Sequence, residues 1–160
     1  MTVFETAILA VVLGIVLFVV AGGVGAMRQQ AKRNLCARLM THLSEALAAY
    51  YRSTGTYPPG SPDASAGGAI AALCRVEGSA AALRGLPASL RVGTEPIVGC
   101  LDPWRRALRY LTADAPGERE RQEVAVNGGV PIFESAGRDG EFSDRGPAGA
   151  TDNFRTSDLR

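Results

Sequence analysis

The sequence predicts an α+β protein in which a long N-terminal α-helix packs with its second half against a small antiparallel β-sheet. Three observations support this fold class. Residues 6–27 form an uncharged apolar run, residues 28–54 continue it with helically spaced leucines, and residues 106–134 hold short strand-like segments around turn residues. A chain of 160 residues is long enough for one globular domain and an appendage. We therefore expect a protruding hydrophobic helix half over residues 1–27, an amphipathic helix half over residues 28–54 and a globular αβ domain over residues 55–160.

The apolar run at residues 6–27 contains 17 hydrophobic residues among 22. A helix of this length reaches about 30 Å, enough to cross the hydrocarbon core of a bilayer. Because the run has no polar stripe, we expect a membrane helix or a helix that other protein buries on all sides. A cleaved secretory signal is the alternative, since Val24-Gly25-Ala26 resembles a cleavage site, but no basic residue precedes the run.

Glu5 is the only charged residue in residues 1–27. A carboxylate at the edge of an apolar helix is costly, which makes it a functional hypothesis by default. One interpretation places Glu5 at the lipid headgroups, where it complements the helix dipole. The other pairs it with a cation, and the nearest one is the α-amino group of Met1 from a neighbouring copy.

The second half of the helix carries one apolar stripe. Four leucines recur every four residues along it, at Leu35, Leu39, Leu43 and Leu47. We interpret the stripe as a packing surface against the domain. Gly55, followed by Pro58 and Pro59, ends the helix, which therefore runs from about residue 2 to 53 and is about 80 Å long if continuous.

In the globular part, the Ala-rich stretch over residues 68–84 predicts one or two short helices, interrupted at Gly78-Ser79. Strands are expected over residues 106–112, 122–126 and 130–134, the last two joined by a turn at Asn127-Gly128. Together these segments predict a small antiparallel sheet.

The cysteines leave two arrangements open. Cys74 and Cys100 enclose a loop of moderate length, and a disulfide between them would stabilise the domain by about 3 kcal/mol in an oxidising compartment. Cys36 would then pack as a small hydrophobic residue. The alternative is three reduced, buried thiols. The only histidine, His42, is expected on the helix surface, which excludes a His-rich zinc site and a Cys/His catalytic pair.

The net charge of +1 provides no general attraction to nucleic acid. The charges are nevertheless segregated. Residues 28–110 hold 11 basic and 5 acidic side chains, whereas residues 111–160 hold 6 basic and 10 acidic ones. Such opposed charges suit either pairing between copies or pairing within one chain.

The N-terminus Met1-Thr2-Val3-Phe4-Glu5-Thr6, followed by an apolar run with Gly14, resembles the mature N-terminus of type IV pilins and type II secretion pseudopilins. The resemblance implies that a prepilin peptidase removes a leader and methylates the new N-terminus, so that Met1 begins the mature chain. Where that family often has proline, this chain has Gly22-Gly23. Because glycine weakens a helix interior by about 1 kcal/mol relative to alanine, we expect a soft or unwound stretch between Gly14 and Gly25.

Two further segments resemble the major pseudopilin. Gly55-Thr-Tyr57-Pro58 is similar to its Gly-x-Tyr-Pro turn after the first helix, and Asp102-Pro103-Trp104, followed by Tyr110, is similar to its Asp-Pro-Trp-Gly segment. Arg105 replaces the glycine of that segment and Ala107 its proline, so the local turn is expected to differ. Trp104 is expected to anchor the core or an elbow of the chain.

Ser135-Ala-Gly-Arg-Asp139-Gly140-Glu141, followed by Asp152-Asn153, resembles the loop that holds calcium in the major pseudopilins. The resemblance implies a calcium site with Asp139 and Asp152 as carboxylate ligands and with Asn153 and Ser135 beside them. Calcium takes six to eight oxygen ligands, which a Gly-rich acidic loop offers. Further carboxylates are available as reserve ligands at Glu134, Glu141 and Asp144. The alternative is a solvated acidic loop whose Asp and Gly residues serve turn geometry.

The resemblance implies a structural, non-enzymatic subunit that polymerises into a helical filament of a type II secretion system and helps to drive protein secretion. Its expected partners are further copies of itself, the inner-membrane assembly platform, the prepilin peptidase and minor pseudopilins. It would lie in the bacterial inner membrane before assembly and in a periplasmic or surface filament afterwards. A surface type IV pilus subunit, serving adhesion, motility or DNA uptake, and a membrane-anchored enzyme or metal-binding domain are the alternatives.

Overall fold

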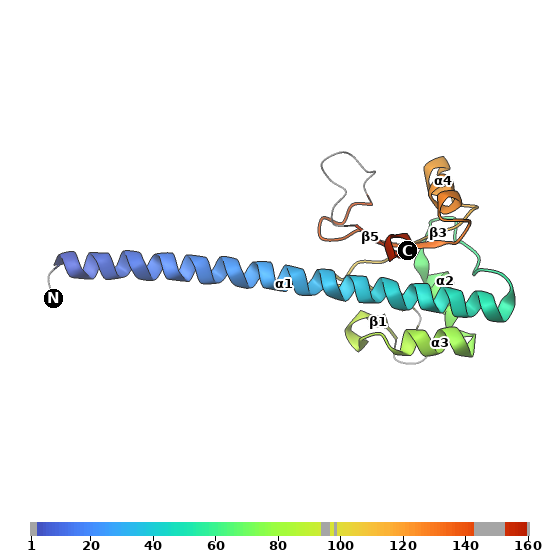
Figure 1. Ribbon diagram of the computed structural model, residues 1–160, viewed down its shortest axis with the longest axis horizontal. Coiled ribbons are helices and arrows are strands. Elements are labelled where there is room, and N and C mark those ends of the chain that lie inside the picture. Colours follow the sequence, from blue (N-terminus) through green and yellow to red (C-terminus); the bar gives the residue numbers. More distant parts are fainter. Residues whose placement is uncertain (1–2, 94–96, 98, 143–152, 160) are drawn as a thin grey trace. The chain divides into compact units, whose positions relative to one another are not determined.

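The chain is an α+β protein with a long N-terminal helix and two small antiparallel sheets (Figure 1), which confirms this part of the predicted fold class. It forms two compact units, Met1–Asn34 and Leu35–Arg160. The computed structural model does not describe the side chains of residues 3–11 and 15–23, and the residues that it describes are 3–93, 97, 99–142 and 153–159.

Helix α1, Val3–Thr54, has the predicted extent. Its predicted end is confirmed, because Gly55 takes the left-handed conformation with a φ of 74° and donates its N–H to the carbonyl oxygen of Tyr51 at 2.8 Å. A left-handed glycine lets the chain leave the helix while satisfying one of the last helical carbonyl groups.

Helix α1 continues through Gly14, Gly22 and Gly23, so the chain is not unwound there, and a softer helix between Gly14 and Gly25 stays a prediction. Glycine costs helix stability, but it keeps its backbone N–H and still donates the i→i−4 hydrogen bond that a proline would remove. The three glycines therefore lower the stability of the helix without ending it.

Over the residues that the structure describes, no helix combines the length and the apolar character needed to cross a bilayer. Most side chains of the apolar run at residues 6–27 lie outside the described ones. The hydrophobic membrane or assembly helix therefore stays a prediction.

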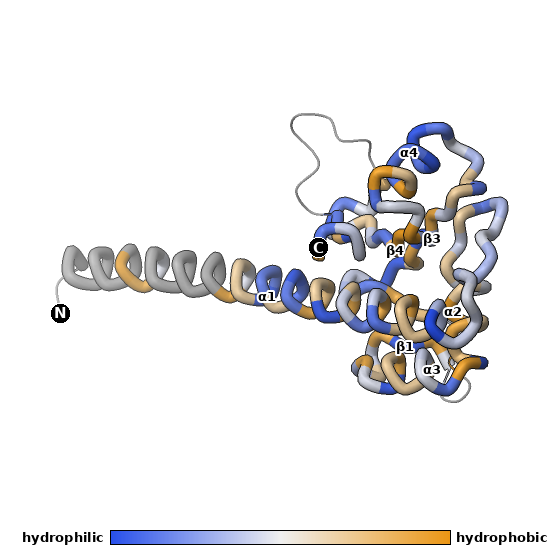
Figure 2. The backbone as a smooth tube through the Cα atoms, turned by 45° about the vertical axis from the view of Figure 1, so that its right-hand side comes forward, coloured by the Kyte–Doolittle hydropathy of each residue, from blue (hydrophilic) through white to orange (hydrophobic). Residues whose placement is uncertain are grey.

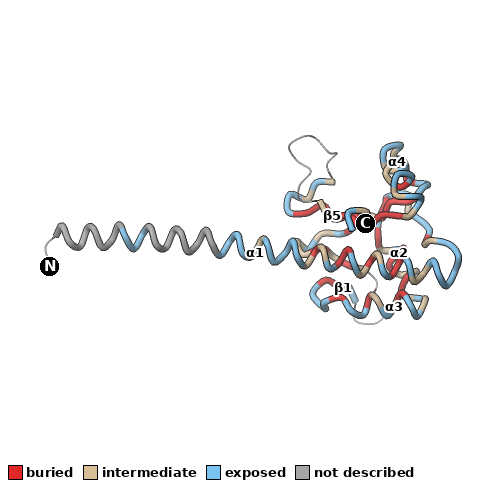
Figure 3. The backbone as a smooth tube through the Cα atoms, viewed as in Figure 1, coloured by how far each residue is buried: buried red, intermediate tan, exposed pale blue. Residues whose placement is uncertain are grey.

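The second half of α1 supplies one side of the main core, as the leucine stripe predicts. Leu39, Leu43 and Leu47 are buried and pack in one cluster with Ile70 and Phe133. The buried residues follow one side of this half of α1 in Figure 3, and hydrophilic and hydrophobic residues alternate along it in Figure 2. Each fully buried leucine contributes about 1.5–3 kcal/mol of transfer free energy, so this stripe is what joins the helix to the domain.

Two short helices, α2 (Ala66–Cys74) and α3 (Glu77–Arg84), follow the loop after α1. The chain breaks between them at Arg75-Val76 and not at the predicted Gly78-Ser79. The buried Ser79 explains the difference, because its hydroxyl donates to the carbonyl oxygens of Leu73 and Val76, at 3.0 Å for the latter, and so satisfies acceptors at this junction. A short 3₁₀ helix, η1, follows at Ala88–Leu90.

Strands β1 (Arg91–Val92) and β2 (Gly99–Cys100) form the two-stranded antiparallel sheet. The larger sheet has the order β3–β4–β5, with β3 at Arg109–Leu111, β4 at Ile132–Ser135 and β5 at Phe154–Arg155. This outcome confirms the strands expected around residues 106–112 and 130–134.

All four residues of β4 are buried, and its two apolar residues pack in different apolar clusters. Phe133 belongs to the cluster with α1, whereas Ile132 packs with Leu111 and Val124 in a second, smaller cluster. Neighbouring side chains in a strand point to opposite faces, so the sheet separates the two clusters.

The strand predicted over residues 122–126 is wrong, since these residues belong to helix α4, Glu118–Val126. Gly117 precedes the helix, and its N–H donates to Glu120 Oε2 at 3.2 Å. Glu118 and Glu120 also place negative charge in the first turn, which the helix dipole favours. Val124 and Val126 alternate with other residues as in a strand, and this pattern led to the wrong prediction. The signals for the helix start lie in the charged residues that precede them.

Candidate functional site

The structure describes little of the two predicted assembly residues, Met1 and Glu5. Met1 is outside the described residues, and Glu5 belongs to α1 with its side chain outside them. Pairing of Glu5 with the Met1 amine of a neighbouring copy therefore stays a prediction.

The cysteines of the predicted disulfide are neighbours with free thiols. Cys74 ends α2 and Cys100 lies in β2, and neither is bonded in the structure. Burial raises the pKa of the Cys100 thiol well above its usual range, and the adjacent Cys74 raises it further. The two predicted partners thus lie close together with unbonded thiols, and the disulfide between them stays a prediction.

Asp102 joins the turn that follows it to the end of strand β4. Its buried carboxylate accepts two backbone N–H groups at Oδ1, from Trp104 and Arg106, each at 2.9 Å. Its Oδ2 accepts the hydroxyl of Ser135 at 2.8 Å, and Ser135 Oγ in turn accepts the N–H of Gly137 at 3.1 Å. Burial of a charge is tolerated where such hydrogen bonds replace water, so Asp102 anchors both segments at once.

Cys36 of α1 lies beside this anchor. Burial raises the pKa of its thiol well above the usual range, a hydrogen bond with Ser135 opposes the shift, and the charge of Asp102 adds to it. The thiol therefore stays protonated at neutral pH. Because Ser135 is engaged by Asp102 and by Cys36, its side chain serves the anchor of the loop rather than pointing freely toward a ligand.

Three of the four predicted calcium ligands, Ser135, Asp139 and Asn153, belong to the loop after β4 or contact its backbone. Asp139 Oδ1 accepts the N–H of Glu141 at 3.0 Å. We assign the Asn153 amide the orientation in which its nitrogen donates to the carbonyl oxygens of Ala136 and Glu141, at 3.1 and 3.2 Å. These contacts tie the chain at residue 153 to both ends of the 136–141 loop.

The calcium site itself stays a prediction. Its fourth ligand, Asp152, and the reserve ligand Asp144 lie outside the described residues. Within the part of the chain that the structure describes, no three His, Cys, Asp or Glu side chains gather in a way that could hold a metal ion. Of the other reserve ligands, Glu141 is exposed, whereas Glu134 is buried in an ion-pair network.

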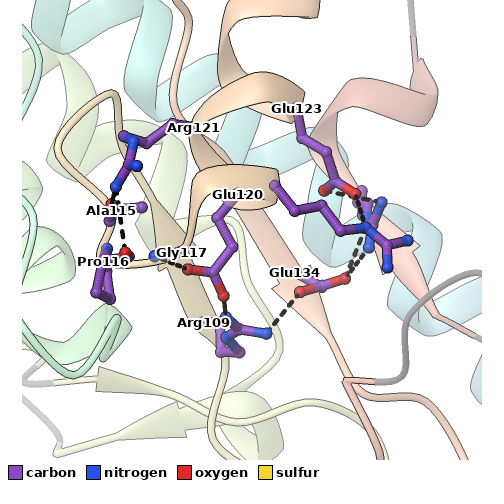
Figure 4. A network of polar contacts seen from close by, with 10 residues as sticks. Arg109, Ala115, Pro116, Gly117, Glu120, Arg121, Glu123 and Glu134 are labelled. Atoms are coloured by element: carbon purple, nitrogen blue, oxygen red, sulfur yellow. Dashed lines mark hydrogen bonds and ion pairs between the residues drawn. The ribbon is translucent and has the colours of Figure 1, made fainter.

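That network was not predicted (Figure 4). Glu134 of β4, whose side chain is 2% exposed, lies between the guanidinium groups of Arg155 and Arg109. Glu134 Oε1 accepts Arg155 Nε at 2.7 Å, and its Oε2 lies 3.5 Å from Arg109 Nη1. Both arginines continue to α4, where Arg109 pairs with Glu120 and Arg155 Nη1 lies 3.1 Å from Glu123 Oε2. The network therefore joins all three strands of the larger sheet to α4.

Electrostatics favour this arrangement. Burial lowers the pKa of the Arg155 guanidinium, but the charges of Glu134, Glu123 and Asp158 outweigh that effect and raise it. The register of the sheet carries the signal that sequence reasoning missed, because Glu134 stands directly opposite Arg109 on one side and Arg155 on the other. Opposite charges facing each other across strands stabilise a sheet.

A groove of about 770 Å³ lies between α4 and the terminal 3₁₀ helix η2, Thr156–Leu159. Arg155 and Glu123 are paired with each other in its wall, and the 90% exposed Val126 stands at its edge. The charges of this wall are balanced internally, and we assign the groove no chemistry.

The segments that carry the family resemblance contact one another across the domain. The hydroxyl of Tyr110 donates to the carbonyl oxygen of Pro58 at 3.1 Å, and Trp104 stacks on Phe154 with ring centroids 6.1 Å apart. The predicted anchoring role of Trp104 is confirmed, since it is half-buried against the main core.

Arg105 takes a left-handed conformation, with a φ of 70°, at the position where the resembled family has glycine. We expect Arg105→Gly to raise the free energy of unfolding by about 0.5 kcal/mol, because glycine adopts this conformation without a steric penalty but loses more entropy on folding. Thermal melting measures the effect. Arg105→Ala is the control, since it removes the exposed side chain and keeps the strain, and an equal rise in both variants would contradict the backbone explanation.

Comparison of the chain with protein-family models, with curated proteins and with solved structures found no match. A function for the chain must therefore rest on its own residues and on the geometry described above.

Proposed function

We propose that the chain is the structural subunit of a type IV-like filament, assembled through its N-terminal helix, and most closely the major pseudopilin of a type II secretion system. The proposal rests on the difference in burial between the two halves of α1. Its second half is buried in the domain core, whereas the described apolar side chains of its first half are exposed, at Val12, Leu13, Val24 and Met27. Apolar helix surface of this kind needs a membrane or further copies of the chain to cover it.

Assembly uses the hydrophobic helix as the contact between subunits. In the membrane the apolar run is solvated by lipid, and in the filament the same surface is covered by neighbouring helices. Glu5 would be costly in such an apolar environment unless a cation offsets it. The Met1 amine of an adjacent copy provides that cation, so the pair sets the register in which a new subunit docks.

The exposed basic residues after the apolar run support contacts between copies. Four of them lie on α1 within eleven residues, at Arg28, Lys32, Arg33 and Arg38, and all are exposed. The acidic surplus of residues 111–160 offers them partners on neighbouring domains. The assembly platform, the prepilin peptidase and minor pseudopilins are the remaining proposed partners, and the filament is proposed to extend from the inner membrane into the periplasm. The same assembly would serve a surface pilus, and the place where filaments accumulate distinguishes the two.

The proposal is tested by expressing the full-length chain with its assembly system and imaging sheared filaments by negative-stain electron microscopy. Glu5→Val is expected to abolish filaments while the subunit remains in the membrane fraction at normal abundance. Glu45→Val is the matched control, because it removes a 60% exposed carboxylate from the same helix. Filaments that form equally well with Glu5→Val would overturn the role of Glu5, and absence of filaments from the unmodified chain would overturn the proposed function.

A further inference from the structure

The guanidinium of Arg106 lies against the loop at residues 136–141. Arg106 is half-buried, and its Nη1 donates to the carbonyl oxygen of Gly137 at 3.3 Å. Gly140 faces the same group, because a Cβ atom at that position would overlap Arg106 Nη1 and Cζ. The loop therefore contacts, at Gly137 and at Gly140, a cation that belongs to the chain itself.

Three backbone carbonyl groups of this loop face N–H donors of the chain itself. The carbonyl oxygen of Ala136 accepts the N–H of Gly140 at 3.3 Å. With the Asn153 amide assigned so that its nitrogen faces these acceptors, it donates to the carbonyl oxygens of Ala136 and Glu141. Together with Gly137, three carbonyl groups of the loop thus accept hydrogen bonds from nitrogen. These are oxygens of the kind that calcium takes as ligands, and a doubly charged ion among them would stand against the positive charge of Arg106.

Asp102 holds the two sides of this contact in place. Its Oδ1 accepts the backbone N–H of Arg106, and its Oδ2 accepts the Ser135 hydroxyl at the start of the loop. The backbone that carries the guanidinium and the strand that carries the loop are therefore fixed to opposite oxygens of one buried carboxylate. The guanidinium is positioned by the same anchor that positions its acceptor.

We propose that Arg106 is a built-in cation that, together with the Asn153 amide, holds the 136–141 loop without a metal ion. The described donors fit this arrangement better than the calcium site that the resemblance implies. Arg106 is a positioning residue in this account, and the inference does not depend on whether the chain polymerises.

The test is trypsin cleavage after the exposed Arg138, measured on the full-length chain in mild detergent and identified by mass spectrometry. In the unmodified protein, cleavage is expected to proceed at the same rate with excess calcium and with a chelator. Arg106→Ala is expected to speed cleavage about tenfold, as loss of a hydrogen bond to a charged group predicts. Arg106→Lys, which keeps the positive charge, is expected to restore part of the protection.

Arg105→Ala is the matched control, because it removes the same charge from the exposed neighbouring position, and its cleavage rate should equal that of the unmodified protein. Protection of the unmodified loop by calcium would overturn the inference in favour of a metal site. Unchanged cleavage in Arg106→Ala would also overturn it. If Arg106→Ala does not fold, Arg106→Lys decides, because it keeps the positive charge, and cleavage about tenfold faster than in the unmodified protein would contradict the role of that charge.

Discussion

Replacing Glu134 by alanine is expected to lower the free energy of unfolding by about 3–5 kcal/mol, the usual effect of removing one partner from a buried ion pair. The Glu134 side chain is 2% exposed, and that of Arg155, its main partner, is 10% exposed. Without the carboxylate, the Arg155 guanidinium keeps Glu123 but loses its contact in the centre of the sheet. Urea unfolding of the full-length chain in detergent, followed by tryptophan fluorescence of Trp104, measures the change.

Glu118→Ala is the matched control, because this exposed glutamate stands in the first turn of α4 and contributes through the helix dipole by less than about 1 kcal/mol. Equal losses in the two variants would contradict a special role for the network. The double replacement Glu134→Leu with Arg155→Met removes both charges together. It is expected to recover much of the lost stability, since an apolar pair carries no unpaired buried charge.

Asp102→Ala is expected to lower the free energy of unfolding by about 3 kcal/mol or more, because each buried donor left without an acceptor costs about 1–3 kcal/mol. The variant removes the acceptor for the N–H groups of Trp104 and Arg106 and for the hydroxyl of Ser135. Since these donors belong to two segments, the turn and the end of β4 should loosen together. Amide hydrogen exchange measures this directly, through faster exchange at Arg106 and at Gly137.

Asp102→Asn separates the two halves of the anchor. The amide oxygen can still accept both backbone N–H groups, so only the Ser135 contact has to rearrange, and the expected loss is about 1 kcal/mol. If the alanine and asparagine variants lose the same stability, the backbone contacts at Oδ1 are not what makes Asp102 important.

Local patterns predicted the elements whose signals lie close together in the chain. The leucines of α1 recur at helical spacing, and Gly55 ends the helix by a conformation that only a few residues adopt readily. Strand β4 was also expected, because its apolar residues follow turn residues. In contrast, α4 was predicted as a strand, since its start depends on Gly117 and Glu120 and its place in the fold depends on distant arginines.

The candidate site also combines features that local sequence predicts with contacts between residues far apart in the chain. Ser135, Asp139 and the later Asn153 were predicted as ligands of one site, and the structure shows each of them in contact with the backbone of the loop after β4. The sequence did not indicate that Arg106 points its guanidinium into that loop. Its hydrogen bond to Gly137 spans 31 residues, and no local spacing rule predicts such a contact.

The sequence by itself determined the long helix, its end, the apolar surfaces and the solitary Glu5, because these follow from the order and the periodicity of neighbouring residues. Only the tertiary structure decided which charges pair and which cation contacts the 136–141 loop. Glu134 meets Arg155 across 21 residues, and Asp102 meets Ser135 across 33. The physical reason is that a buried charge is stable only beside a partner, and which residue becomes that partner is set by strand register and chain path.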